Sequence, residues 1–66
     1  MVDVERLKAK IKDSGMTIVS ICEKANMTRE TFYNRLRDPN YTISEALTLK
    51  GILHLSNNEF NEIFLQ

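Results

Sequence analysis

Apolar residues recur along the chain at helical spacing, in five segments separated by short polar stretches. In the first segment, Val4, Leu7 and Ile11 share one face of a helix, because they stand at i, i+3 and i+7. No stretch alternates convincingly between apolar and polar residues with the period of two that a half-buried strand requires. The pattern therefore predicts an all-α protein of five helices, organised as a single domain over residues 1–66.

Capping and turn residues indicate where the first two helices begin and end. Asp3 is a suitable N-cap for a helix over about residues 3–14, and Gly15 is placed to stop it. Thr17 is an N-cap type for the second helix. This helix should end at Asn26, since asparagine tolerates the left-handed conformation of a tight turn. Its expected inner face consists of Ile18, Ile21, Cys22 and Ala25.

The other three helices have similar boundary residues. Thr28 opens the third, which must end near Arg37 because Pro39 disfavours helical geometry at the residue before it. The fourth and fifth open with capping boxes, Thr42–Glu45 and Ser56–Glu59. The expected inner faces are Phe32 and Leu36 in the third helix, Ile43, Ala46, Leu49 and Leu53 in the fourth, and Phe60, Ile63 and Phe64 in the fifth.

Length and composition limit the possible functions. Sixty-six residues leave no room for a substrate domain or a deep cleft, so we expect neither an enzyme nor a small-molecule substrate. With one cysteine and one histidine, the chain builds neither a disulfide framework nor a zinc site, and we expect no metal or cofactor. A lone thiol suits the cytoplasm, and no apolar run approaches the roughly 18 residues of a membrane span.

The net charge of zero argues at first against a nucleic-acid partner, whose binders usually carry a basic excess. The charge is unevenly distributed, however. Residues 1–40 hold eight basic and six acidic side chains, a net charge of +2, whereas residues 41–66 hold one basic and three acidic side chains, a net charge of −2. The basic excess therefore lies in the part that contains the second and third helices.

The second and third helices are short, and only Asn26, Met27 and Thr28 separate their apolar stripes. Such a tight connection makes the two helices cross steeply. Steep crossing is the geometry of a helix-turn-helix, whose second helix enters the DNA major groove. Cys22 and Ala25 supply the small side chains that the crossing needs, and Met27 supplies an apolar plug after the turn.

The segment Thr17–Leu36, TIVSICEKANMTRETFYNRL, resembles the helix-turn-helix of the Cro and phage-repressor (XRE-type) family. Met27–Tyr33 is especially similar to small regulators of phages and prophages of Gram-positive bacteria, and the resemblance extends over nearly the whole chain. At Ile18 the family often has glutamine. The resemblance implies a compact five-helix, lambda-repressor-like domain that binds double-stranded operator DNA and regulates transcription, usually as a homodimer.

If the third helix enters the major groove, its N-terminal residues are the ones that reach base edges. The expected base-reading residues are Arg29, Glu30, Thr31 and Asn34. The expected phosphate contacts are Thr17, Lys24, Thr28, Tyr33, Arg35, Arg37, Asn40 and Tyr41. Two alternatives stay open: Arg29, Glu30 and Asn34 are ordinary surface residues, or Tyr33 belongs to the core.

The last helix carries more apolar side chains than one buried face needs. Phe60, Phe64 and Leu65 are therefore expected to form a homodimer interface, the alternative being that the apolar residues of this helix all belong to a monomer core. A different function also stays open, in which a helix-turn-helix fold binds a protein partner, as an antitoxin or inhibitor does. The sequence does not distinguish a repressor from a Cro-type antagonist or an activator.

Overall fold

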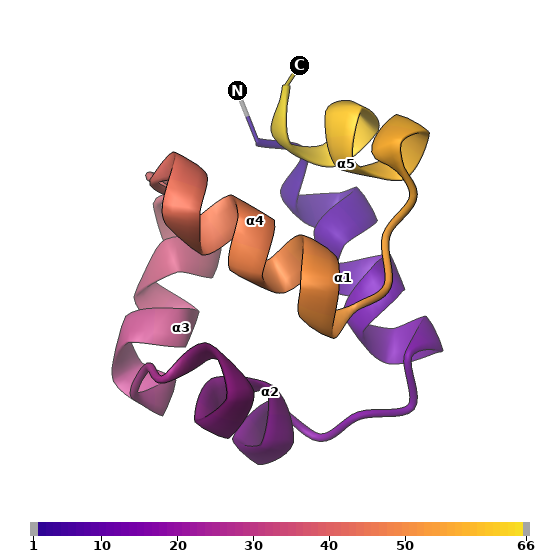
Figure 1. The fold of residues 1–66 in the computed structure, drawn as a ribbon. Helices are drawn as coiled ribbons and strands as arrows, with labels where there is room; N and C mark the ends of the chain where they lie inside the picture. Colours follow the sequence, from indigo (N-terminus) through magenta and orange to yellow (C-terminus); the bar gives the residue numbers. More distant parts are fainter. Residues whose placement is uncertain (1, 66) are drawn as a thin grey trace.

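Five α-helices make up residues 2–65, the part of the chain that the computed structural model describes, and this part contains no strand (Figure 1). They are α1 (Val4–Asp13), α2 (Ile18–Ala25), α3 (Arg29–Arg37), α4 (Ile43–Ile52) and α5 (Asn57–Phe64). Figure 1 shows α4 at the centre of the view with the other helices arranged around it. The prediction of an all-α protein with five helices is confirmed. None of these helices is both long and apolar enough to cross a bilayer.

Each helix begins at the N-cap that the sequence indicates. The capping side chain accepts a hydrogen bond from the backbone N–H three residues later at Asp3, Thr17, Thr28, Thr42 and Ser56. Both capping boxes are complete, because the carboxylates of Glu45 and Glu59 accept from the N–H groups of Thr42 and Ser56 at 2.9 Å. An N-cap typically contributes about 1 kcal/mol, so these caps fix the helix boundaries locally.

Three of the connections between helices contain a residue in the left-handed region: Gly15 (φ 72°), Asn26 (φ 55°) and His54 (φ 53°). The sequence indicated the first two but not His54. After α4, the N–H of Leu55 donates to the carbonyl of Lys50 at 3.0 Å, and the N–H of His54 donates to that of Gly51 at 3.4 Å. This pair of bonds is a Schellman motif. The motif and the burial of Leu55 place His54 in a conformation that histidine does not itself favour.

Side chains from all five helices meet in one core. The fully or nearly buried members are Leu7, Ile11, Ile21, Cys22, Phe32, Ala46, Leu49, Leu53, Leu55, Ile63 and Phe64. In this core α2 packs against α3 and α4, while α1 packs against α5. Cys22 is one of the buried residues, as its place on an apolar stripe predicted, and burial raises the pKa of its thiol.

The prediction was wrong for one residue that the sequence assigned to the core. Ile43 was expected on the inner face of α4, but it is 80% exposed. The buried stripe of α4 is Ala46, Leu49 and Leu53, and Ile43 lies to one side of it at the first position of the helix. Leu47, one turn further along, is 51% exposed. Apolar residues thus flank the buried stripe of α4, so spacing alone does not identify the inner side.

Polar contacts join α1 to α5 at the surface. The N–H of Asp3 donates to the carbonyl of Ile63 at 2.7 Å. Arg6 bridges Asp3 and Glu62 at 3.1 and 2.9 Å, and Lys10 forms an ion pair with Glu59. The ammonium of Lys10, followed by the N–H of Ser56, lowers the pKa of Glu59 to about 2.

We expect the Lys10–Glu59 ion pair to make the stability of the protein depend on pH in the acidic range. The folded pKa of Glu59, about 2, lies below the usual glutamate value of about 4.3. Its stabilising effect is therefore complete above about pH 4.5 and is lost as the pH falls towards 2. In Glu59→Gln, whose amide oxygen still caps α5, the melting temperature should fall less between pH 6 and pH 2.5 than in the wild type. The exposed Glu5→Gln should behave like the wild type, and an equal fall in all three proteins would contradict the expectation.

We expect Gly51→Ala to stabilise the protein by about 0.5 to 1 kcal/mol, because alanine loses less backbone freedom than glycine in a helix. Gly51 lies within α4, and no atom stands within 4 Å of the position that a Cβ would take. Gly15→Ala is the matched control. It also enters open space, but φ is +72°, so it should destabilise by about 1 kcal/mol. Urea unfolding measures both, and a loss of stability in Gly51→Ala would contradict the expectation.

Candidate nucleic-acid interface

The connection between α2 and α3 is short, and each of its residues makes a defined contact. Asn26 takes the left-handed conformation, and the N–H groups of Asn26 and Met27 donate to carbonyls in the last turn of α2 at 3.2 and 3.0 Å. Met27 packs against the core, and the hydroxyl of Thr28 accepts from the first turn of α3 at 3.1 Å. One turn residue, one apolar anchor and one cap thus complete the connection.

α3 has one buried side and one exposed side. Phe32 is fully buried and Leu36 packs against the core, so these two residues fix the rotation of the helix. The opposite side, which we call the α3 face, consists of the exposed residues Arg29, Glu30, Tyr33, Asn34 and Arg37. These residues therefore project away from the core.

The residues of the α3 face differ in how they are held. Within residues 2–65, Arg29 and Glu30 form no ion pair and no side-chain hydrogen bond, whereas Arg37 donates to the amide oxygen of Asn34. Tyr33 is 49% exposed, and its ring meets that of Phe32 edge-on with centroids 5.8 Å apart. The Tyr33 side chain is therefore partly exposed to solvent and partly packed on a core residue, which is intermediate between the two interpretations that the sequence left open.

A hollow of about 500 Å³ adjoins the α3 face. Its lining includes Glu30, Tyr33, Asn34 and Arg37 from α3, together with Lys8 from α1. Lys8 is not one of the residues that the sequence pattern predicted for DNA contact. Its position beside α3 depends on how α1 packs, and no local pattern reveals that.

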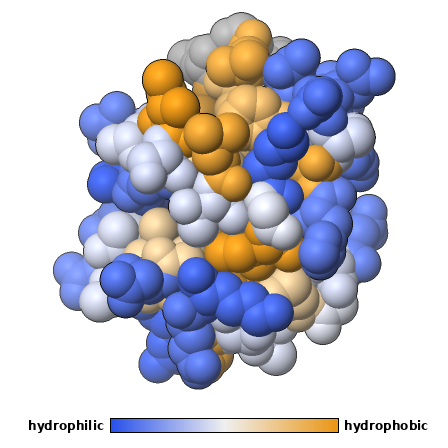
Figure 2. All heavy atoms as spheres, in the orientation of Figure 1, coloured by the Kyte–Doolittle hydropathy of each residue, from blue (hydrophilic) through white to orange (hydrophobic). Residues whose placement is uncertain are grey.

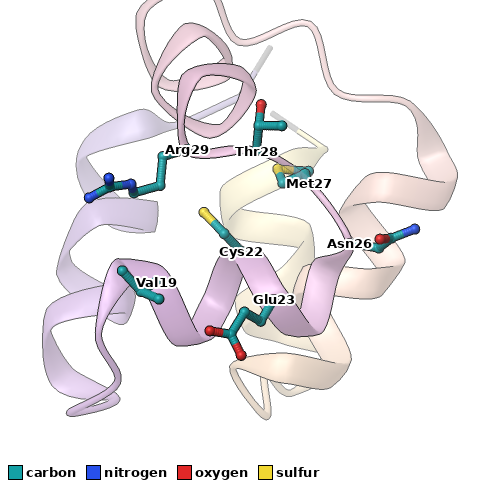
Figure 3. Close-up of a pocket in the computed structure, with 7 residues that line it drawn as sticks. All are labelled: Val19, Cys22, Glu23, Asn26, Met27, Thr28 and Arg29. Carbon is teal, nitrogen blue, oxygen red and sulfur yellow. The ribbon is translucent and has the colours of Figure 1, made fainter.

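A second hollow, also about 500 Å³, lies between α2 and the start of α3 (Figure 3). In Figure 3 the sulfur of Cys22 points from α2 towards the start of α3, and Arg29 extends on the side of Val19. Glu23 and Thr28 also line this hollow. The guanidinium of Arg29 therefore lies over an open surface that both helices form.

The remaining candidates fall into two groups. Thr17, Lys24, Thr28 and Asn40 are exposed, as a phosphate contact requires, whereas Thr31, Arg35 and Tyr41 are half-buried. Thr31 accepts from the hydroxyl of Thr28 at 3.0 Å and lines a polar groove that continues to α4. It thus lies at the edge of α3 nearest α4, beside the α3 face rather than on it.

Arg35 and Tyr41 are part of the contact between α3 and α4. Arg35 donates to Glu45 at 3.3 Å, and the same carboxylate caps α4 through the N–H of Thr42. That N–H and the guanidinium of Arg35 lower the pKa of Glu45. Burial, followed by the carboxylate of Glu45, raises the pKa of Tyr41 to about 12. Arg35 thus joins α3 to α4 by a hydrogen bond, whereas the ring of Tyr41 packs against Phe64 and its hydroxyl has no hydrogen-bond partner among residues 2–65. The assignment of these two residues to phosphate contacts stays a prediction.

The three residues predicted for the dimer interface also differ in exposure. Phe64 is buried, and its ring lies 5.6 Å from that of Tyr41 and 5.2 Å from that of Phe60. Phe60 is half-buried, with the ammonium of Lys50 5.6 Å from its ring centroid. Leu65 is 67% exposed. One of the three is thus a core residue, and the large exposed side chains near Leu65 come from α4.

No family model matches this chain, and no curated protein or solved structure is detectably similar to it.

We expect Arg35→Met to lower the free energy of unfolding by about 1 kcal/mol, because it removes a hydrogen bond to a half-buried carboxylate. The pKa of Glu45 should rise, since one of the two groups that lower it is gone. Arg37→Met makes the same chemical change on the α3 face and should leave both quantities within error. Urea unfolding and an NMR titration of the Glu45 carboxyl measure them, and an unchanged Glu45 pKa in Arg35→Met would contradict the expectation.

Proposed function

We propose that this protein is a sequence-specific DNA-binding regulator in which α2 and α3 form a helix-turn-helix and α3 enters the major groove. The observation that carries this proposal is the α3 face. A helix fixed on one side by a fully buried phenylalanine presents, on the other side, a guanidinium and a carboxylate with no ion-pair partner among residues 2–65. Side chains left unpaired on a rigid helix are suited to pair with an external ligand.

The dimensions and chemistry of α3 suit base recognition. A helix with its side chains is about 10–12 Å across, and the major groove is about 12 Å wide. In this proposal, Arg29 donates to the two acceptors of guanine, Glu30 accepts from the amino group of cytosine, and Asn34 pairs with adenine. Asn34 exchanges its contact with Arg37 for the base, which releases Arg37 towards a phosphate. Thr31, at the edge of the face, is left for a thymine methyl group.

Phosphate contacts surround this face in the proposed complex. The N-terminal N–H groups of α2 and α3, next to Thr17 and Thr28, attract phosphate oxygens. Lys24, Arg37 and Lys8 supply positive charge, and Tyr33 and Asn40 supply neutral donors. Three cations per chain make the electrostatic part of binding small, in keeping with the net charge of zero. Each neutralised phosphate contributes about −0.9 to the slope of log K against log salt, so we expect a slope of roughly −3 per bound chain.

Of the possible regulatory outcomes, repression requires nothing beyond DNA binding. A protein seated in the major groove of an operator that overlaps a promoter excludes polymerase by occupying the DNA. We therefore propose a repressor or Cro-like role.

Selection from a random double-stranded DNA pool, followed by fluorescence polarisation across salt concentrations, tests this function. We expect one enriched sequence. Arg29→Ala and Asn34→Ala should each lose about 1–3 kcal/mol at one base position and relax the preference there. Arg37→Ala should weaken binding to all sequences alike and make the salt slope shallower by about 1.

Lys12→Ala is the control, because Lys12 is an exposed lysine at the end of α1 that lines neither hollow beside α3. It should bind DNA as the wild type does. If no sequence is enriched, or if Arg29→Ala and Asn34→Ala bind with unchanged preference, the DNA proposal fails. The protein-binding alternative, an antitoxin or inhibitor with this fold, would then be favoured.

A further inference from the structure

Two opposite charges line the hollow between α2 and the start of α3 without pairing with each other. Arg29 and Glu23 both border this hollow of about 500 Å³, which we call the α2–α3 hollow. Within residues 2–65, neither side chain forms an ion pair or a hydrogen bond. In Figure 3 the side chain of Val19 lies between the guanidinium and the carboxylate. A ligand in this hollow therefore meets a donor on one side, an acceptor on the other and an apolar surface between them.

Three side chains form the apolar surface of the α2–α3 hollow. Val19 is 48% exposed on α2, the sulfur of Cys22 points towards the start of α3, and Met27 comes from the turn between the two helices. Burial raises the pKa of Cys22, so its thiol stays neutral at physiological pH. The exposed apolar residues at the start of α4, which Figure 2 shows at the surface, border a groove whose lining contains no charged side chain. The α2–α3 hollow differs from that groove, because its charged groups also orient a ligand.

We propose that the α2–α3 hollow recognises 5-methylcytosine directly before the guanine that Arg29 contacts, an inference that rests on the proposed DNA function. The methyl group on C5 of a pyrimidine projects into the major groove, as the thymine methyl group does. When the pyrimidine precedes guanine on the same strand, the two bases stack about 3.4 Å apart. A guanidinium that donates to O6 and N7 of the guanine therefore lies beside this methyl group. Because a guanidinium is planar and weakly hydrated, its face packs well against an apolar group.

Val19 and Glu23 distinguish 5-methylcytosine from the other pyrimidines. Val19 supplies the second apolar contact for the methyl group, which unmethylated cytosine lacks. The amino group at position 4 of cytosine is a donor, whereas thymine carries an acceptor oxygen at the same position. The carboxylate of Glu23 accepts from the amino group and repels the thymine oxygen. Of these bases, 5-methylcytosine alone supplies both the methyl group and the donor.

The α2–α3 hollow suits the edge of a base better than it suits a phosphate. A phosphate drawn in by Arg29 would also approach the carboxylate of Glu23, which repels it. It would in addition bring a charged group onto the apolar side chains of Val19 and Cys22, where it loses hydration. A base edge carries no net charge, and its methyl group gains from the apolar contact. The hollow is larger than one methyl group, so it admits the edge of the base together with the methyl group.

The test compares four DNA duplexes by fluorescence polarisation. Each has the sequence enriched by the selection, in which the lost preference of Arg29→Ala identifies the guanine. The base before that guanine is cytosine, 5-methylcytosine, thymine or uracil, with its complement opposite. We expect 5-methylcytosine to bind about fourfold tighter than cytosine, and thymine about fourfold tighter than uracil, because each pair differs by one buried methyl group. 5-Methylcytosine should bind about tenfold tighter than thymine, because Glu23 then meets a donor in place of an acceptor.

Two variants separate the methyl group from the amino group. Val19→Ser should remove the advantage of 5-methylcytosine over cytosine. Glu23→Gln should remove its advantage over thymine, because an amide both donates and accepts. The matched controls are Leu47→Ser, at a residue 51% exposed on α4, and Glu5→Gln, at an exposed residue of α1; both should keep both ratios. Each readout is a ratio between two duplexes bound by the same protein, so a general loss of stability or affinity does not change it.

Several outcomes would overturn the proposal. One is equal or weaker binding of 5-methylcytosine relative to cytosine, and another is a methyl preference that survives in Val19→Ser. A third is an enriched sequence with no guanine whose preference depends on Arg29. The first two results leave the proposed DNA function standing, because the protein still selects a sequence. If no sequence is enriched from the pool, the proposed function fails, and this inference fails with it.

Discussion

The burial of Phe32 is the constraint on which the candidate interface depends. Phe32 is the one residue of α3 that is fully buried, so it sets which residues of that helix turn inward and which turn outward. Arg35, one turn later, bonds to Glu45 and fixes the far end of α3 to α4. Phe32 in the middle of α3 and Arg35 near its end therefore both determine which way the α3 face points.

Glu45 has a second role, because its carboxylate both caps α4 and holds α3. The start of α4 is also where Ile43 projects into solvent. The same few residues therefore position both the face that we propose for DNA and the exposed aliphatic side chains at the start of α4. A change at Glu45 would disturb both surfaces together, whereas changes at Arg29 or Leu47 affect one surface only.

Much of this fold is encoded locally, and those parts were predictable. The N-caps, both capping boxes and the turn at Asn26 each depend on a few neighbouring residues, and the structure has all of them. The positions of Ile43, Lys8 and Arg35 depend instead on which helices lie beside one another. His54 takes a left-handed conformation because the end of α4 and buried Leu55 require it there. Sequence patterns predict helices well, but they do not predict which helices pack against one another.

In the proposed DNA complex, the length of α3 limits how much sequence one chain can read. Its nine residues span about 13 Å at 1.5 Å per residue, the length of about four base pairs at 3.4 Å each. A four-base sequence recurs about every 250 base pairs, too often to mark one operator among the competing sites of a genome. Two copies bound on adjacent half-sites would read about eight base pairs, a sequence that recurs about every 65,000 base pairs. In the proposed function, one α3 helix therefore does not mark an operator by itself.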